Sequence, residues 1–473
     1  MLLELDGDGP RYRQIGRAVL QAIQSGKLAP GRRVPSSRQL ATELGCARNL
    51  VLLAYEQLVL EGYLRSTARG GTFVAPDLRV GPMRDSNGVP RRREGPLSAP
   101  SAQGRRILAA VRQAMPTVAA IGQSPVDFAL GQFNPDGRMV RAMARAASAV
   151  IREGRLGYGA PHGLRRLREL LSERVRLLRG ISCSPEQVIV TSGTQQSLDL
   201  CARLLLTEGD QAIVEDPGYG WARAAFAAAG AIVRSVALDD EGMLIPMSAR
   251  GSERVRLTFV TPSRQMPVGV TMSVGRRQAL LDWARRAGSM ILEDDYDGEM
   301  LYQGRPLKAL AALDSSAESV IYSACFAKSL APALRLAYLV VPESLVSAFA
   351  DFKWLADRGS PPILQQLVVR LMESGEYDRH IVRMRRRHLQ RQEVLTRALA
   401  THFGNAVQLT GGSGGNHLLV WPDRLTERNL KSLVMDCAGR GVGIYPLSLY
   451  AVRPLKRPGI LLGYGGIEAE QPF

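Results

Sequence analysis

Long apolar runs, paired cysteines and an export signal are absent from this 473-residue sequence. No uncharged apolar run reaches the roughly 18 residues that a membrane-spanning helix needs. The first residues, MLLELDGDGP, do not place a basic stretch before an apolar one, as a secretory signal peptide would. The five cysteines are scattered and form no C-x-x-C pair, which disfavours a disulfide scaffold and a zinc site. We therefore expect a cytoplasmic protein with no membrane partner and no metal site.

Lysine is scarce as well, with six lysines among the 61 basic residues, yet the formal net charge is +17. Part of this charge is concentrated, because residues 1–106 hold 17 Lys and Arg against 9 Asp and Glu, a net of +8. An arginine-rich composition alone produces a similar total. Its concentration near the N-terminus nevertheless favours an anionic partner such as DNA at that end.

The chain exceeds the roughly 250 to 300 residues that one core can organise, so at least two folded domains are expected. Residues 1–76 form a unit that is dense in helix-period apolar residues and ends in a Gly-rich hairpin. Residues 77–104 are rich in Pro, Gly, Ser and Arg, which is typical of a flexible linker without secondary structure. Residues 105–473 then form a larger domain.

Helical patterns alternate with short β-rich runs in this larger domain. A helix is predicted over 163–179, and the β-rich runs are 188–191, 212–215, 258–260, 290–293 and 319–322. Such alternation predicts an α/β fold, with a mixed, mainly parallel sheet covered by helices on both faces. Beyond the Arg-rich run 383–388, the run 417–421 indicates a smaller C-terminal α/β subdomain.

Two helices joined by a Gly-containing turn are predicted over residues 34–45 and 47–63. Ser36 and Ser37 are candidate caps of the first helix. The apolar face of the second helix consists of Val51, Ala54, Tyr55 and Leu58. Arg48 and Asn49 are then exposed at its N-terminal end, where a recognition helix reaches base edges and phosphates in the major groove. A plain helical pair with a solvated basic face is the alternative interpretation.

The whole N-terminal unit closely resembles the GntR-type winged helix-turn-helix domains. The resemblance rests on residues 10–15 (PRYRQI), 26–31 (GKLAPG), 35–41 (PSSRQLA), 54–58 (AYEQL), 61–63 (EGY) and 70–74 (GGTFV). It implies a double-stranded DNA operator as partner, and contacts to DNA from Ser37, Arg38, Arg48 and the wing. The hairpin tip Arg69, Gly70, Gly71 and Thr72 suits that wing, beside the exposed Asn49 of the helix. Ala47 and Leu50 depart from the family's usual hydroxyl residues.

Three features of the larger domain point to one cofactor. Lys328 is the only lysine between Lys308 and Lys353 and lies in an apolar stretch, where desolvation would lower its pKa. Residues 291–297 (ILEDDYD) place four acids after an apolar run, and residues 191–195 (TSGTQ) form a Gly turn between a strand and a helix. Each feature alone has another interpretation. Lys328 also fits a surface lysine, residues 291–297 a metal site, and residues 191–195 an ordinary turn.

Together they supply the groups that pyridoxal phosphate requires. Lys328 offers the amine for a Schiff base, Asp294 a carboxylate for the pyridine nitrogen, and Tyr296 a hydroxyl for O3′. The backbone of Ser192, Gly193 and Thr194 at a helix N-terminus suits the phosphate.

The same order and spacing resemble the fold-type I aminotransferases and, with the N-terminal domain, the MocR subfamily of GntR-type regulators. The resemblance covers nearly the whole chain and rests on residues 156–165 (LGYGAPHGLR), 191–196 (TSGTQQ), 215–219 (EDPGY), 261–269 (TPSRQMPVG), 293–297 (EDDYD), 327–335 (AKSLAPALR) and 415–418 (GNHL). It implies that Lys328 is the Schiff-base lysine, Tyr219 the ring-stacking aromatic residue and Arg335 the phosphate-binding arginine. It also implies a head-to-tail homodimer in which Tyr158 reaches the cofactor phosphate of the partner subunit.

Several positions depart from the family pattern. Cys325 and Ala327 replace hydroxyl residues near the phosphate, while Arg264 and Met266 replace a frequent His and a frequent aromatic residue. Residues 460–464 (ILLGY) contain no arginine to anchor a substrate carboxylate, and Arg453 is a weak substitute.

These features support three functional hypotheses. The leading one is a regulator whose aminotransferase-like domain senses an amino compound, or pyridoxal phosphate itself, through aldimine chemistry at Lys328. A working aminotransferase with an accessory DNA-binding domain is the second. A degenerate regulator that no longer binds the cofactor is the third. The sequence does not indicate the operator, the effector or the direction of the response.

Overall fold

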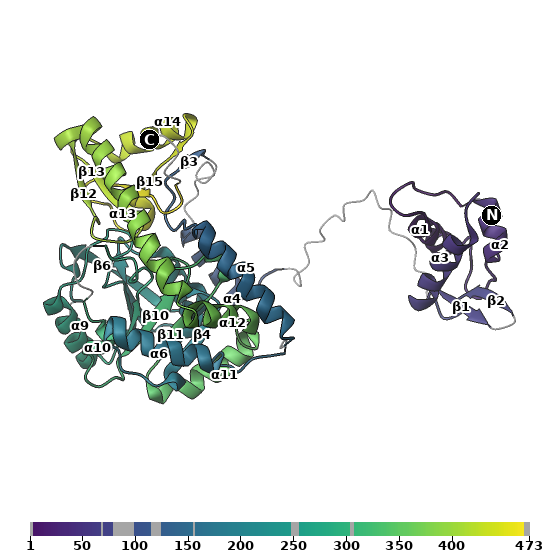
Figure 1. Ribbon diagram of the computed structural model, residues 1–473, viewed down its shortest axis with the longest axis horizontal. Helices are drawn as coiled ribbons and strands as arrows, with labels where there is room; N and C mark the ends of the chain where they lie inside the picture. Colours follow the sequence, from purple (N-terminus) through teal and green to yellow (C-terminus); the bar gives the residue numbers. More distant parts are fainter. Residues whose placement is uncertain are drawn as a thin grey trace. The chain divides into compact units, whose positions relative to one another are not determined.

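The computed structural model describes residues 3–67, 70–78, 99–114, 124–154, 157–246, 255–302 and 307–467 (Figure 1). The chain divides into two compact units, Met1–Ala99 and Pro100–Phe473. The division falls within the predicted linker 77–104, most of which lies outside the described residues. Helix α4 (Ala102–Ala114) begins inside that segment, with the Ser101 hydroxyl accepting from the Gly104 N–H at 3.0 Å, which corrects the prediction that the segment has no secondary structure.

The N-terminal unit contains three helices followed by a β-hairpin. Its elements are α1 (Arg11–Gln24), α2 (Ser37–Glu43), α3 (Arg48–Leu60), β1 (Leu64–Thr67) and β2 (Gly71–Val74). The predicted apolar face of α3 is buried, and one core joins it to α1, α2 and the hairpin. Ser36, and not Ser37, caps α2, since its hydroxyl accepts from the Gln39 N–H at 3.2 Å. The winged helix-turn-helix architecture is therefore confirmed.

The larger unit is built on a mixed eight-stranded sheet with the order β4-β11-β10-β9-β8-β5-β6-β7. The strands are β4 (Val188–Thr191), β5 (Gln211–Asp216), β6 (Ile232–Asp239), β7 (Gly242–Met243), β8 (Val255–Val260), β9 (Met290–Asp294), β10 (Val320–Cys325) and β11 (Ala337–Val340). The five strands from β10 to β6 are parallel, whereas β11 and β7 run antiparallel to their neighbours. The predicted mainly parallel sheet is confirmed.

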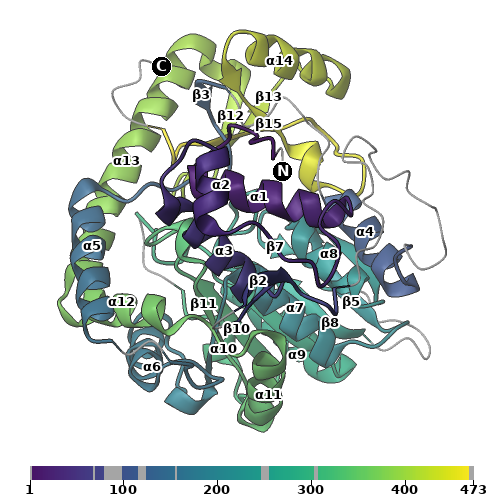
Figure 2. The ribbon, with the colours of Figure 1, turned by 90° about the vertical axis from the view of Figure 1, so that its right-hand side faces the viewer.

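Helices cover both faces of this sheet. Successive side chains of a strand point to opposite faces, so neighbouring residues of one strand belong to different cores. Val188 and Val190 belong to one core with α5 (Gly137–Arg152), α6 (Arg165–Arg179), α12 (Pro362–Glu373) and α13 (Glu376–Phe403). Ile189 belongs to a second core with α7 (Thr194–Leu205), α8 (Gly220–Ala228) and α11 (Val346–Asp357). A third core contains residues of α9 (Val274–Ala287) and α10 (Leu310–Leu313). Figure 2 shows α5, α6, α12 and α13 on one side of β10 and β11, with α7 and α8 on the other.

A smaller subdomain completes the unit, as predicted. It contains β12 (Val407–Thr410), β13 (His417–Pro422), α14 (Glu427–Gly439), β15 (Tyr445–Pro446) and β16 (Ile460–Gly463), with β3 (Val126–Asp127) pairing to β14 (Val442–Gly443). The Arg-rich run 383–388 lies within α13, which continues to the subdomain in Figure 1. Among the described residues, no helix is both long and apolar enough to span a membrane.

Candidate functional site

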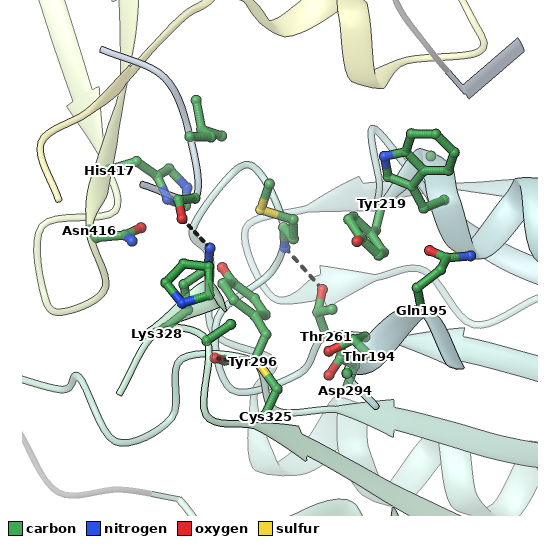
Figure 3. Close-up of a pocket in the computed structure, with 18 of the residues that line it drawn as sticks. Thr194, Gln195, Tyr219, Thr261, Asp294, Tyr296, Cys325, Lys328, Asn416 and His417 are labelled. Atoms are coloured by element: carbon green, nitrogen blue, oxygen red, sulfur yellow. Dashed lines mark hydrogen bonds between the residues drawn. The ribbon is translucent and has the colours of Figure 1, made fainter. Parts of the chain in front are cut away.

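One cavity of the larger unit has a volume of about 420 Å³, within the ~300 to 1,000 Å³ typical of small-molecule sites. It lies where β9 and β10 end and where α7 begins after β4, at the carboxyl ends of the strands. In α/β sheets this edge usually carries the ligand site. In Figure 3, Lys328 and Tyr296 lie on one side of the pocket and Tyr219 and Gln195 on the other. The pocket thus collects most of the residues that the sequence indicated for the cofactor.

Lys328 follows β10 and is half-buried in the pocket wall. Its Nζ donates a hydrogen bond to the Gly131 carbonyl, drawn as a dashed line in Figure 3. Burial lowers the pKa of Lys328, and the nearby Cys325 and Asp297 partly oppose that shift. A lowered pKa increases the fraction of neutral amine, which is the nucleophilic form.

Asp294 and Tyr296 present buried polar atoms that form no hydrogen bond of regular geometry. Asp294 ends β9 and is 4% exposed. Its Oδ1 atom and the Tyr296 Oη atom form no hydrogen bond of regular geometry, although Ser323 lies near Asp294 and Asp297 near Tyr296. Burial raises the pKa of Asp294 to about 8, and the carboxylates of Asp295 and Asp297 contribute in the same direction. Buried polar atoms without a well-formed hydrogen bond are costly, so the pair suits a group that donates to Asp294 and accepts from Tyr296.

The turn before α7 forms a cradle with Arg335. Gly193 has φ +99° and a Cβ there would lie 2.8 Å from the Arg335 Nη2 atom, so only glycine lets the guanidinium approach the turn. Thr194 is the first residue of α7, where backbone N–H groups have no partner within the helix and the helix dipole favours an anion. Arg335 itself has φ +47° and adds a full positive charge. The arrangement suits a phosphate group.

Tyr219 supplies the aromatic wall of the pocket. It is the N-cap residue of α8, and its ring packs against Phe259 with the centroids 6.4 Å apart. Burial is the main cause that raises the pKa of its hydroxyl, so the ring stays neutral at ordinary pH.

Two predicted cofactor residues lie outside the cavity wall. The Ser192 hydroxyl contacts Asp357 Oδ2 at 3.3 Å and Ser360 Oγ at 3.1 Å. Tyr158 is 86% exposed and packs edge-on against Trp354, with ring centroids 6.4 Å apart. An exposed Tyr158 is free to reach another subunit, which remains a prediction.

The positions that depart from the family pattern have different structural roles. Cys325, Ala327 and Met266 line the pocket. Arg264 is 6% exposed and donates to the Gly411 and His417 carbonyls at 3.0 and 2.7 Å, which ties its loop to the C-terminal subdomain. Arg453 forms an ion pair with Asp216 at 3.4 Å and is not part of the pocket wall, so the weak suggestion that it anchors a carboxylate is not supported.

Several polar and aromatic residues of the pocket were missed by sequence reasoning. They are Gln195, Trp221, Thr261, Asn416, His417 and Tyr450. Asn416 and His417 belong to the quoted GNHL motif and Thr261 to the TPSRQMPVG motif, so motif membership was the available signal. Trp221 and Tyr450 come from segments whose placement depends on tertiary packing. The pKa of His417 falls well below 6.5 because of burial and then of Arg264, so its ring is neutral.

The N-terminal unit places its predicted DNA contacts at the start of α3 and in the hairpin. Arg48 and Asn49 are exposed, as is Arg38, and the Arg48 Nε donates to the Ser37 hydroxyl at 3.2 Å. Gly70 and Thr72 are half-buried in the hairpin, while the predicted contact Arg69 lies outside the described residues. Arg33, which sequence reasoning missed, approaches the hairpin, since a Cβ on Gly71 would lie 2.8 Å from its Nε.

Known proteins match both units of the chain. Residues 11–74 match the family described as bacterial regulatory proteins, gntR family, and residues 125–430 match aminotransferase class I and II. The probable rhizopine catabolism regulatory protein MocR of Rhizobium meliloti is 34% identical over 471 residues, 99% of this chain and 92% of that protein. The chain belongs to the MocR subfamily of GntR-type transcriptional regulators. It is therefore a DNA-binding transcriptional regulator whose large domain has the class I and II aminotransferase fold.

Other relatives extend this result. The HTH-type regulator TauR of Rhodobacter capsulatus is 34% identical over 93% of this chain and 89% of its own length. The pyridoxine biosynthesis regulator PdxR of Corynebacterium glutamicum is 30% identical over 96% of this chain and 91% of its own length.

Among solved structures, LysN of Thermus thermophilus aligns with a TM-score of 0.65 and 27% identity over 77% of this chain and 92% of that chain. LysN is an α-aminoadipate aminotransferase solved in complex with N-(5′-phosphopyridoxyl)-L-leucine. The aminotransferase fold of this MocR-type chain is thus shared with a protein that binds a pyridoxal phosphate adduct.

Proposed function

We propose that the chain is a pyridoxal phosphate-dependent regulator whose larger unit senses an amino compound, or the cofactor itself, at Lys328. The proposal includes a double-stranded DNA operator as partner of the N-terminal unit. It also includes a cytoplasmic location, and a head-to-tail homodimer in which Tyr158 serves the partner's site. The proposed domains are 1–76 for DNA binding, a linker to about residue 101, and the remaining chain for the sensor.

One observation carries the cofactor assignment. Asp294 and Tyr296 hold buried oxygen atoms that lack a hydrogen bond of regular geometry, in the same pocket as the half-buried Lys328 amine. A pyridinium N–H would satisfy Asp294, and a phenolic oxygen on the same ring would accept from Tyr296. The donor and acceptor types of the pocket therefore fit pyridoxal phosphate.

The remaining groups support the same assignment. Gly193, Thr194 and Arg335 form a cradle whose positive charge is complementary to a phosphate group. Tyr219 offers a flat face to an aromatic ring. When bound, the cofactor would supply an aldehyde that condenses with the Lys328 amine with loss of water and that can exchange to another primary amine, which frees the lysine.

Sensing needs a contact that changes when Lys328 changes its bonding partner. The Lys328 Nζ donates to the carbonyl of Gly131, in the segment between β3 of the subdomain and α5. With Lys328 bonded to the cofactor this donor would be lost, and a primary amine that took its place would restore it. Such a contact gives the larger unit two arrangements whose balance a ligand can shift.

A working aminotransferase is the second candidate, and the intact set of Lys328, Asp294 and Tyr296 favours it. Turnover also requires the substrate to be held for proton transfer at its Cα atom. The cationic side chains that line the described part of the pocket are Lys328 and Arg335, which the cofactor would use. We therefore propose slow or vestigial transamination.

The proposed site is tested by an absorption spectrum of the purified protein with pyridoxal phosphate, followed by borohydride reduction and peptide mapping. We expect a yellow band that borohydride bleaches, with the label on Lys328. The variant Lys328→Ala should keep the fold and lose the label, because it has no amine at this position. The phosphate and ring contacts remain. Lys431→Ala, an exposed lysine of α14, is the matched control and should label like the wild type. A label on another lysine, or no label at saturating cofactor, would refute the assignment.

A further inference from the structure

Asp357, the last residue of α11, connects that helix to the loop that precedes α7. Its Oδ2 atom accepts from the Gln196 Nε2 at 2.7 Å and from the Ser192 hydroxyl at 3.3 Å. Its Oδ1 atom accepts from the Gly359 N–H at 3.0 Å. Both oxygens accept from the Lys353 ammonium at 2.6 Å. One carboxylate therefore contacts three segments of the chain.

Helix stability does not explain an aspartate at this position. A carboxylate in the last turn of a helix interacts unfavourably with the helix dipole. The i, i+4 order with lysine first and the acid second is also the weaker orientation of a helical ion pair. The carboxylate does neutralise Lys353, whose side chain is fully buried. The contacts with Ser192 and Gln196 remain to be explained.

These contacts hold the strand-to-helix turn from its outer side. The Gln196 side chain bridges the turn, since its Oε1 accepts from the Ser192 N–H at 2.7 Å while its Nε2 donates to Asp357. Gly193 and Thr194 follow Ser192 directly in the chain, and they face Arg335 and the pocket. The turn is thus fixed by side chains behind it, and its pocket side stays open.

The charge of the pair also suits an anion site. The Asp357 side chain is 27% exposed, and although burial alone would raise its pKa, hydrogen bonds from Lys353 and Gln196 lower it. The carboxylate therefore stays ionised and Lys353 balances its charge. An unpaired carboxylate behind a phosphate site would repel the phosphate, whereas the pair adds no net charge.

We propose that Asp357, neutralised by Lys353, is a positioning residue that fixes the Ser192–Gly193–Thr194 turn in the conformation that binds the cofactor phosphate. The proposal rests on the proposed cofactor site and assigns Ser192 a role behind the turn. It predicts a specific defect: loss of the carboxylate weakens recognition of the phosphate and spares recognition of the ring.

The test compares pyridoxal phosphate with pyridoxal, which has the same aldehyde and ring but no phosphate, in absorbance titrations of the full chain. For Asp357→Asn we expect about tenfold weaker binding of pyridoxal phosphate, the effect of losing a charge-assisted hydrogen-bond network, and unchanged binding of pyridoxal. Asp351→Asn, an exposed carboxylate of the same helix, is the matched control and should bind both as the wild type does.

A second variant separates positioning from stability. Gln196→Leu breaks the bridge between the turn and Asp357 and leaves the Lys353–Asp357 pair in place, so it should show the same selective loss even if Asp357→Asn does not fold. Equal losses for both ligands, or no loss in either variant, would overturn the positioning role while the cofactor site stands. A wild-type protein that binds neither ligand would overturn the cofactor site as well.

Discussion

At the scale of single residues, Asp294 illustrates how a site is maintained at the expense of stability. Its folded-state pKa of about 8 lies above the ordinary value of 3.8, so folding favours the protonated form. The contribution of Asp294 to the free energy of unfolding is greatest below about pH 4 and is lost as the pH rises toward 8. A bound pyridinium would reverse the effect by pairing with the carboxylate.

We therefore expect Asp294→Asn to stabilise the cofactor-free protein by about 1 to 3 kcal/mol at pH 8 and by less at pH 5, while pyridoxal phosphate binding is lost. Thermal unfolding of both proteins at the two pH values measures this difference. Asp199→Asn, an exposed carboxylate of α7, should show little change at either pH. A variant that destabilises the protein more at pH 8 than at pH 5 would contradict the account of Asp294.

At the scale of helices and strands, periodicity was sufficient where neighbours in the sequence decide the structure. The apolar spacing of α3 predicted its four buried residues, and the β-rich runs predicted five strands of the large sheet. The prediction missed the start of α4, because three of its residues belong to a segment of linker-like composition. Contacts between distant segments, such as Ser192 with Asp357 and Arg264 with His417, could not be predicted, since sequence spacing carries no information about them.

The recognition helix provides the test at this scale. Arg48 is exposed at the first turn of α3, and replacing it with alanine should weaken binding to an operator selected with the wild-type protein by about 5- to 150-fold, or ~1 to 3 kcal/mol. Arg13→Ala, an exposed arginine of α1, is the control for a general loss of charge. Gel-shift titrations at two salt concentrations measure both effects. Unchanged operator binding by Arg48→Ala would show that α3 is not the reading helix.

At the scale of the whole molecule, two compact units with separate cores are joined through a segment of linker-like composition. A ligand in the larger unit can change DNA binding only by the difference between its affinities for the two states of the protein. Coupling of this kind is usually about 1 to 3 kcal/mol, which corresponds to 5- to 150-fold in affinity.

The central claim is that the chemistry of Lys328 controls operator binding, and the most direct test is operator affinity measured with and without pyridoxal phosphate and a panel of primary amines. For the wild type we predict a change of about 5- to 150-fold with the cofactor or with one class of amine. In Lys328→Ala the response to amines should be lost, while Lys431→Ala should respond as the wild type does. An operator affinity that no ligand changes, together with rapid multiple turnover of amino acids, would contradict the account and favour an enzyme.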